Sequence, residues 1–469
     1  MDPERAANAP GEQQVEDAME NAADAPRSRR RWWIWPLGLL VFLVVGHTVW
    51  TLVWRHRYES RIDAMRANGV MVDLTDHASK PVPDAQNAAI PFAQAAAWYE
   101  EHLQGDAAIT DYVGAWEDTN TDPEDEHYRE ELARLRRWLA SGDRYVELLG
   151  ETARRPGWYE ELAWETGMGM EVLAIPRMAR AIDFLSERVR RAERWTPQVT
   201  SELLVMVRLS DRVELPILIG RLVSWTMKRR AADTLIAASG LPGFDASRVW
   251  EAVQADFVPG PVADQLRRVW AEERAIGIWC TRELIEGWDL LSFLDQLAIP
   301  DGPPRERREW WSWPYRALLY SDGVRFLDLI DRAEELTPLA AHEASARADA
   351  LAEEAALKHG RLISALWSVV PVKGFEARQR YVATMRVARV GLALLVLHER
   401  TGAWPQELDP ALELVDADDL IDPYTGKRLL WEPGVRLAAD RPIDGWTLEE
   451  ARRFGDLVEW LFEGSESGR

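Results

Sequence analysis

The sequence predicts a protein that is all-α in the main, with one N-terminal transmembrane helix and a small C-terminal strand and turn module. Three observations lead to this prediction. A run of 23 residues near the N-terminus carries no charged side chain, helix start and stop signals recur through the middle of the chain, and strand-like runs occur only near its end. Because the helix caps follow no fixed period, we expect an irregular helical-hairpin or solenoid-like ectodomain.

The first 31 residues form an acidic tail that ends in a cluster of arginines. Residues 1–26 carry seven acidic side chains and almost no large apolar ones. A segment of this composition buries too little apolar surface to fold, so we expect the tail to be disordered.

Residues 32–54 are the expected transmembrane helix. At 1.5 Å per residue they span about 34 Å, which is enough for a hydrocarbon core of about 30 Å. The run is longer than the apolar part of a signal peptide, and a charged segment follows it instead of a small-residue cleavage site, so we expect the anchor to be retained. Indole side chains, which favour the headgroup region, mark both ends: Trp32, Trp33, Trp35, Trp50 and Trp54.

His47 is the one ionisable side chain within this apolar run. An ionisable group inside a membrane can mark a functional site. The alternative is a neutral histidine that the bilayer tolerates or that is paired in an oligomer, and this second interpretation is favoured.

Arginines flank the apolar run on both sides, so a simple charge count does not orient the helix. The cluster on the N-terminal side is the tighter of the two, and a large C-terminal domain can cross a membrane whatever its charge. We therefore expect a single-pass membrane protein with a cytoplasmic N-terminus and the large domain outside the cytoplasm. The arginines are Arg27, Arg29, Arg30 and Arg31 on one side and Arg55, Arg57, Arg61 and Arg66 on the other.

Cap residues followed by proline predict helix starts in the body of the chain. The pairs are Asp122-Pro123, Thr196-Pro197 and Thr337-Pro338, and the last opens a helix that is expected to end at Gly360. The turn-rich, charged stretch 299–309 is the best internal boundary. The expected order is a helical ectodomain over 55–298, a loop over 299–309, a second helical part over 310–400, a strand and turn module over 401–445, and a terminal helix and tail over 446–469.

Composition excludes several classes of protein. The 78 acidic residues outnumber the 56 Lys and Arg, which gives a formal net charge of -22 and argues against a nucleic-acid partner. The single cysteine, Cys280, excludes an intrachain disulfide framework and a CxxC redox pair.

Two pairs of segments carry a resemblance to a known family. The first pair is RANGVMVDLTD, after the apolar run, and PVPDAQNAA at 81–89; the second is RVARVGLALLVLHERTGAWPQELDPA and IDPYTGKRLLW at 421–431. They resemble a family of uncharacterised bacterial proteins that have one N-terminal membrane helix, a helical middle and a short C-terminal strand and turn module. The resemblance implies the same organisation and a bacterial envelope location, and it implies no reaction.

The last segment is also similar to the soluble end of type II secretion pseudopilins, where a helix leads into a proline-containing turn and a small sheet. The chain departs from a pseudopilin in its long helical insertion, in its closing segment and in the absence of a prepilin-type cleavage context. The likeness therefore does not imply polymerisation into a pilus.

The pattern most similar to a metal site is Asp118, Asn120 and Asp122, which match alternate positions of an EF-hand loop. Pro123 stands where the loop needs a glycine, and Arg129 stands where it needs a bidentate glutamate. An acidic loop that caps the next helix is the favoured interpretation, and weak calcium binding is the alternative.

No recognisable catalytic motif occurs, so we assign no catalytic, cofactor-binding or metal-binding residue and expect no cofactor. The densest aromatic cluster is Trp310, Trp311 and Trp313. Neighbouring positions on a helix point about 100° apart, so at least one of these indoles should be partly exposed. Core packing is the commoner role of such residues, and a contact with a partner protein or an envelope glycan is the hypothesis.

We expect an envelope protein that is anchored to the lipid bilayer through residues 32–54 and acts as a helical scaffold or binding protein, and we favour a role without enzymatic activity. The alternative is an envelope hydrolase that acts on glycan or peptide through two carboxylates no motif reveals. The partner is expected to be a protein or an envelope glycan.

Overall fold

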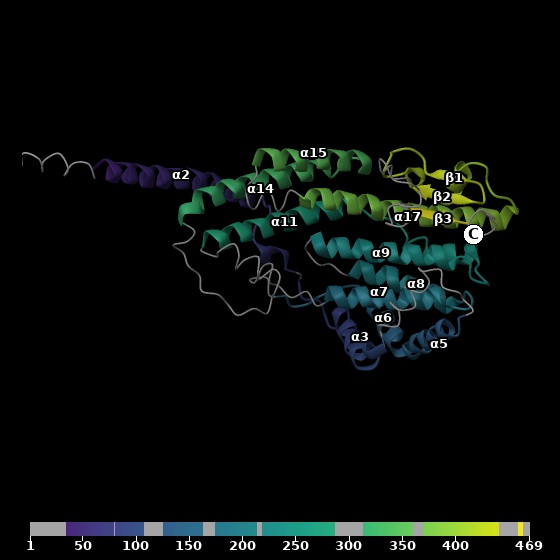
Figure 1. The fold of residues 1–469 in the computed structure, drawn as a ribbon. Helices are drawn as coiled ribbons and strands as arrows, with labels where there is room; N and C mark the ends of the chain where they lie inside the picture. Colours follow the sequence, from purple (N-terminus) through teal and green to yellow (C-terminus); the bar gives the residue numbers. More distant parts are fainter. Residues whose placement is uncertain are drawn as a thin grey trace, which may run out of the picture.

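The computed structural model describes residues 34–78, 80–106, 125–162, 174–212, 218–286, 313–359, 369–439 and 458–462. These ranges are mostly helical, which confirms the predicted fold class (Figure 1). The α-helices are α2 Ile34–Ala67, α3 Ala89–His102, α5 Glu126–Ser141, α6 Asp143–Arg154, α7 Ala174–Arg190, α8 Pro197–Arg212, α9 Leu218–Ala238, α10 Ala246–Val253, α11 Val262–Ile285, α14 Arg316–Leu336, α15 Ala341–His359 and α17 Val369–Thr401. Short 3-10 turns are η2 Leu74–His77, η3 Gln104–Asp106, η5 Trp313–Tyr315, η6 Asp409–Glu413 and η7 Ala417–Leu420.

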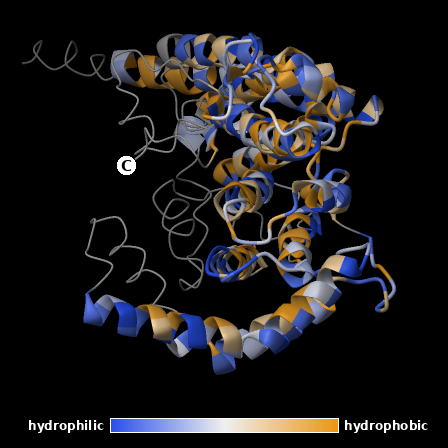
Figure 2. Cartoon of the chain, turned by 90° about the vertical axis from the view of Figure 1, so that its right-hand side faces the viewer, coloured by the Kyte–Doolittle hydropathy of each residue, from blue (hydrophilic) through white to orange (hydrophobic). Residues whose placement is uncertain are grey.

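Most helices are stacked in layers, and α2 extends from one end of the stack as a long rod (Figure 1). Through the stack, α3 packs on α6, α6 on α8, α8 on α9, α9 on α17 and α17 on α15. On the side of the rod, α14 packs on both α2 and α11. Viewed from one end of the stack, the hydrophobic sides of neighbouring helices face each other (Figure 2).

The described helices on both sides of the expected 299–309 boundary share one continuous hydrophobic core. Gly277 of α11 lies so close to Phe326 of α14 that an added Cβ would be 2.0 Å from the Phe326 ring. Trp270 of α11 is fully buried and lies against Phe375 of α17, with 5.6 Å between the ring centroids. The proposed loop 299–309 itself lies outside the described residues.

Of the three predicted helix starts, one is confirmed, one is wrong, and one lies outside the described residues. Helix α8 begins at Pro197 as expected, and the Thr196 hydroxyl accepts a hydrogen bond from the Val199 N–H at 3.3 Å. Helix α5 begins at Glu126 and is capped by Asp125, which accepts from His127 N at 2.8 Å. Asp122 and Pro123, the predicted start, lie outside the described residues.

Helix α15 begins at Ala341, and not at Thr337-Pro338. Thr337 instead ends α14: its N–H donates to the carbonyl of Glu334 at 3.0 Å. Its hydroxyl oxygen accepts a hydrogen bond from the indole N–H of Trp270 at 2.9 Å. The threonine is therefore held by a distant tryptophan and does not cap the following helix, whose end at His359 matches the prediction.

Helix α17 is the central helix of the core. It is long and apolar enough to cross a membrane, like α2, but 78% of its apolar window is buried inside the protein. Two charged side chains, Arg386 and Arg389, lie within this helix. This second helix meets the length and composition criteria for a membrane span, but it serves as a core helix of the domain.

The C-terminal module contains one antiparallel sheet in the order β1-β2-β3, formed by Leu430–Glu432, Arg436–Ala439 and Val458–Leu461. Before β1, the predicted turn is present: Asp422 accepts from Tyr424 N at 2.8 Å and from the Thr425 hydroxyl at 2.8 Å. Gly426 has φ +70°, a conformation that favours glycine.

The prediction of a terminal helix is wrong for residues 458–461, which form strand β3 and pair with β2. Trp460 and Phe462 are buried, whereas Leu461 between them is exposed. This alternation has the period of a strand, not that of a helix.

Candidate functional site

The apolar half of α2 is exposed on every side. All residues from Ile34 to Gly46 are exposed, and none of the apolar window is buried inside the protein. The helix is 34 residues long and continues without interruption to Ala67. From Tyr58 onward, one face of it is buried against the helical domain. One rigid element therefore joins the exposed apolar segment to the folded core.

His47 lies where the domain first meets α2. Its Nε2 donates a hydrogen bond to the carbonyl oxygen of Trp313 at 2.9 Å, and the two rings make an edge contact with 4.8 Å between centroids. The polar histidine of the apolar run is thus paired within this chain. We expected a neutral histidine that the bilayer tolerates or that is paired in an oligomer. In the structure, His47 contacts the first turn before α14.

The neighbouring hydroxyl groups of the apolar run are also satisfied. The Thr48 hydroxyl donates to the carbonyl of Val44 at 2.8 Å, and the Thr51 hydroxyl donates to the carbonyl of His47 at 2.9 Å. Such bonds to the preceding turn leave no open donor on these side chains, which is what a lipid environment demands.

Charged side chains begin directly after Trp54. The Arg57 guanidinium lies over the Trp54 ring, 5.1 Å from its centroid, and Arg55 pairs with Glu59 at 2.8 Å. One turn further, Arg61 binds Asp331 of α14 at 2.6 Å and also pairs with Asp328. The two ion pairs of Arg61 hold α2 on α14 just beyond the apolar run.

A cavity of about 440 Å³ lies beside this charged part of α2. Arg282 and Arg66 both bind Asp73, at 2.7 and 2.9 Å, and the Arg282 guanidinium, followed by that of Arg66, lowers the pKa of the Asp73 carboxyl. Burial raises the pKa of the Tyr58 hydroxyl, which donates to the carbonyl of Ile278 at 3.4 Å. The cavity is lined by Arg55, Tyr58, Glu59, Ile62, Asp63, Arg66, Arg282, Ile285, Glu286, Arg316 and Tyr320.

The structure places one of the three tryptophans proposed as a contact surface. Trp313 is 43% exposed, and Tyr315 beside it is 58% exposed. Trp310 and Trp311 lie outside the described residues, as do Asp118, Asn120 and Asp122. Among the residues that the structure describes, no three His, Cys, Asp or Glu side chains gather as a metal site.

Sequence reasoning missed a buried carboxyl group in α11. Glu273 is 4% exposed, and burial raises its pKa to about 7. Its Oε1 accepts a hydrogen bond from the N–H of Leu218 at 3.0 Å. Leu218 opens α9, so this carboxyl caps a helix and the geometry gives it a structural role.

The arginines after the apolar run were considered only as charges that orient the helix. The structure shows that Arg61 and Arg66 are held in ion pairs of the domain. The sequence signal that could have indicated these ion pairs was the spacing of Arg57, Arg61 and Arg66 on a helix that continues past the apolar run. Their carboxylate partners could not be chosen among 78 acidic residues.

Comparison with known proteins finds no matching family model, no matching curated protein and no matching solved structure.

Proposed function

We propose that this protein is a membrane-anchored helical scaffold or binding protein of the bacterial envelope, single-pass, with residues 32–54 as the membrane span. The observation that carries the proposal is the continuity of α2. Its first half is apolar and exposed on every side, and its second half is part of the hydrophobic core. A flexible tether would let the domain tumble, whereas a continuous helix sets the position of the domain relative to the bilayer.

The distribution of arginines supports a cytoplasmic N-terminus. The four arginines before the apolar run lie within residues 27–31, whereas the four after it are spread over residues 55–66. The tighter cluster gives the larger local positive charge beside the membrane, and such charge favours the cytoplasmic side. The proposal therefore has the large domain outside the cytoplasm.

The contact between His47 and Trp313 supports a domain that rests on the bilayer. Ile34 and His47 are about 20 Å apart along a helix that needs about 30 Å to cross the hydrocarbon core. The first turn before α14 therefore lies beside the membrane span, and not beyond its end. Its exposed aromatic side chains, Trp313 and Tyr315, are of the two types that favour the bilayer interface. Because of this location, we favour lipid, and not a glycan, as the contact of Trp313.

The anchoring experiment is a membrane-extraction test of the full chain. Leu43→Arg puts a charge at the centre of the apolar run, and Leu412→Arg puts the same charge at an exposed position of the C-terminal module. The unaltered protein and Leu412→Arg should stay in the membrane pellet after alkaline carbonate washing, whereas Leu43→Arg should lose retention. Release of the unaltered protein by carbonate would contradict anchoring.

The orientation is tested by labelling single cysteines, in a Cys280→Ala background, with a membrane-impermeant maleimide. Leu412→Cys should react in intact spheroplasts, and Ser28→Cys should react only after permeabilisation. The reverse pattern would overturn the orientation without affecting the anchoring result.

A further inference from the structure

A second cavity lies between the start of two helices, the middle of α17 and the turn before the sheet. Its volume is about 420 Å³, within the range of sites for small molecules. Helix α17 contributes Arg378, Val382 and Arg386, and the turn contributes Ile421, Asp422 and Pro423. The remaining lining comes from the chain that opens α11 and from the chain that opens α15.

Two arginines form the cationic wall of this cavity. Arg378 donates through its two terminal nitrogens to the carbonyls of Thr337 and Leu339, both at 3.1 Å. Arg386 donates to the carbonyl of Ile421 at 2.6 Å. Neutral carbonyls are therefore the partners of both cations, and no carboxylate in the described ranges forms an ion pair with either one.

Each of these guanidinium groups also has an unsatisfied donor. The Nε of Arg378 and the Nε of Arg386 are buried and have no hydrogen-bond partner among the described residues. Burial lowers the pKa of both groups, and the charge of Arg386 lowers that of Arg378 further. Two half-buried cations that repel each other are stabilised by an anion between them.

The starts of α11 and α15 add backbone donors to the same cavity. Pro261 precedes α11, and Ala340 precedes α15. The first N–H groups of a helix have no partner within it, and the aligned peptide dipoles favour negative charge there. A helix start alone does not make a site, but here two of them line a cavity whose wall also holds Arg378 and Arg386.

Carboxylates lie near Arg386: the charges of Asp419, Asp418 and Asp422 raise its pKa against the effect of burial, although none of the three forms an ion pair with it within the described residues. The carboxylate of Asp422 accepts from Tyr424 N and from the Thr425 hydroxyl within its own turn. Asp418 is exposed to solvent. His342, which also lines the cavity, packs over Gly426: an added Cβ at this glycine would lie 2.5 Å from the His342 ring. The turn therefore closes one side of the cavity.

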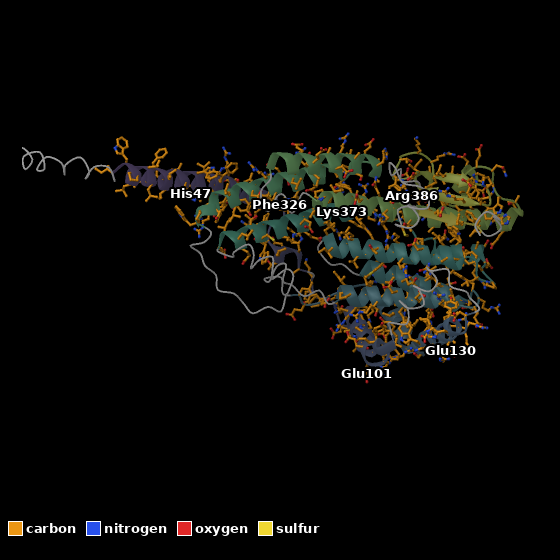
Figure 3. All side chains as sticks on the ribbon, in the orientation of Figure 1. His47, Glu101, Glu130, Phe326, Lys373 and Arg386 are labelled. Atoms are coloured by element: carbon orange, nitrogen blue, oxygen red, sulfur yellow. The ribbon has the colours of Figure 1, made fainter. Side chains whose placement is uncertain are left out.

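We propose that this cavity binds the phosphate group of a small soluble ligand. A phosphate dianion matches the two arginine charges, and its oxygens can accept from both guanidinium groups and from the helix starts. Arg386 lies toward the sheet, with Phe326 and Lys373 between it and His47 (Figure 3). The ligand therefore comes from the aqueous phase, and not from the bilayer beside His47.

The binding test uses the full chain in lipid nanodiscs and isothermal titration calorimetry. The probes are inorganic phosphate, glycerol 3-phosphate and acetate. We expect saturable binding of at least one of the two phosphates, with acetate at least about 10-fold weaker because it has one charge. Binding of only the ester would mean that the organic part also contributes, which supports a ligand larger than phosphate.

Variants then assign the binding to this cavity. Arg378→Gln and Arg386→Gln should each weaken phosphate binding by about 10-fold or more, since each removes a charge-assisted contact. Arg400→Gln is the matched control, because Arg400 is exposed at the end of the same helix, and it should bind as the unaltered protein does. Unchanged binding by the double variant would overturn the proposal.

A measurement on the unaltered protein covers the case in which the variants do not fold. Phenylglyoxal modifies accessible arginines, and the modified peptides are identified by mass spectrometry. Phosphate should slow the modification of Arg378 and Arg386 several-fold and leave that of Arg400 unchanged. If neither phosphate binds below about 10 mM, or if no protection is seen, the cavity is not a phosphate site.

Discussion

The indole of Trp460 lies directly against Gly391: a Cβ added at this glycine would be 2.1 Å from the Cε3 atom of the ring. Trp460 is on β3 and is 1% exposed, and Gly391 is in the middle of α17. The last strand of the small sheet is therefore packed directly on the central helix of the core. The C-terminal module and the helical stack share one hydrophobic interior.

Gly391→Ala should destabilise the protein because the added methyl group displaces the Trp460 ring. Overpacking of this kind costs about 1–3 kcal/mol in the free energy of unfolding. Thermal unfolding of the full chain measures it. Gly150→Ala in α6 is the control: its nearest neighbour, Val205 Cγ2, would be 3.9 Å away, so this change should be neutral or stabilising. Equal stability of the two variants would show that β3 does not pack on α17.

Glu273→Gln should change how stability depends on pH. Burial raises the pKa of Glu273 from its ordinary value of 4.5 to about 7. The folded protein therefore binds the proton more tightly than the unfolded chain does. The stabilisation from this proton is fully present below pH 4.5 and is lost as the pH rises through about 7. The loss corresponds to about 3 kcal/mol.

The measurement compares unfolding of the variant and the unaltered protein at a series of pH values. Glutamine cannot lose a proton, so the stability of Glu273→Gln relative to the unaltered protein should rise by about 3 kcal/mol between pH 4.5 and 7.5. Glu251→Gln, at an exposed position of α10, should show a constant difference. A constant difference for Glu273→Gln as well would show that its carboxyl is not buried.

Arg61→Gln should loosen α2 from α14. Arg61 pairs with Asp328 and Asp331, and Asp331 also binds Arg274 at 3.0 Å. Removing the shared cation leaves two carboxylates facing each other, at a cost of about 1–2 kcal/mol. Hydrogen exchange of the amides in residues 55–67 should become faster, because this stretch opens with a lower free energy.

Arg57→Gln is the control for this experiment. Arg57 lies on the same helix and is exposed, and its contact within the described part of the chain is the Trp54 ring. Its loss should leave amide exchange in α2 almost unchanged. If Arg61→Gln also leaves the exchange unchanged, the ion pairs do not hold α2 on the domain.

Local patterns predicted those parts of the fold that neighbouring residues decide. The uncharged run, the start of α8 and the turn at Asp422 each depend on a few consecutive residues, and each is found. Thr337 shows the limit of such patterns. It resembles a cap, but its hydroxyl oxygen accepts a hydrogen bond from the indole of Trp270, which is 67 positions away in the sequence.

The candidate site depends on contacts that are even more distant in the sequence. His47 and Trp313 are 266 positions apart, and no local pattern pairs them. The expected terminal helix failed for the same reason, since the strand at 458–461 is stabilised by the space that Gly391 leaves for Trp460. Arg386 carried no prediction from the sequence, and its place in the wall of the second cavity is visible only in the folded chain.

Tyr315 should lie at the bilayer interface, since it follows Trp313, whose carbonyl is bound to His47 inside the apolar run. A nitroxide label on Tyr315→Cys, in a Cys280→Ala background in liposomes, reports its surroundings through collisions with oxygen, which enriches in lipid, and with a polar nickel chelate. We expect oxygen to relax this label more strongly than the chelate does. Leu412→Cys is the matched control, because Leu412 is also an exposed apolar residue, 42% against 58% for Tyr315, but belongs to the C-terminal module. Its label should be relaxed mainly by the chelate. If the Tyr315 label behaves like the Leu412 label while the chain stays in the membrane, the anchor holds but the domain does not rest on the bilayer at this turn.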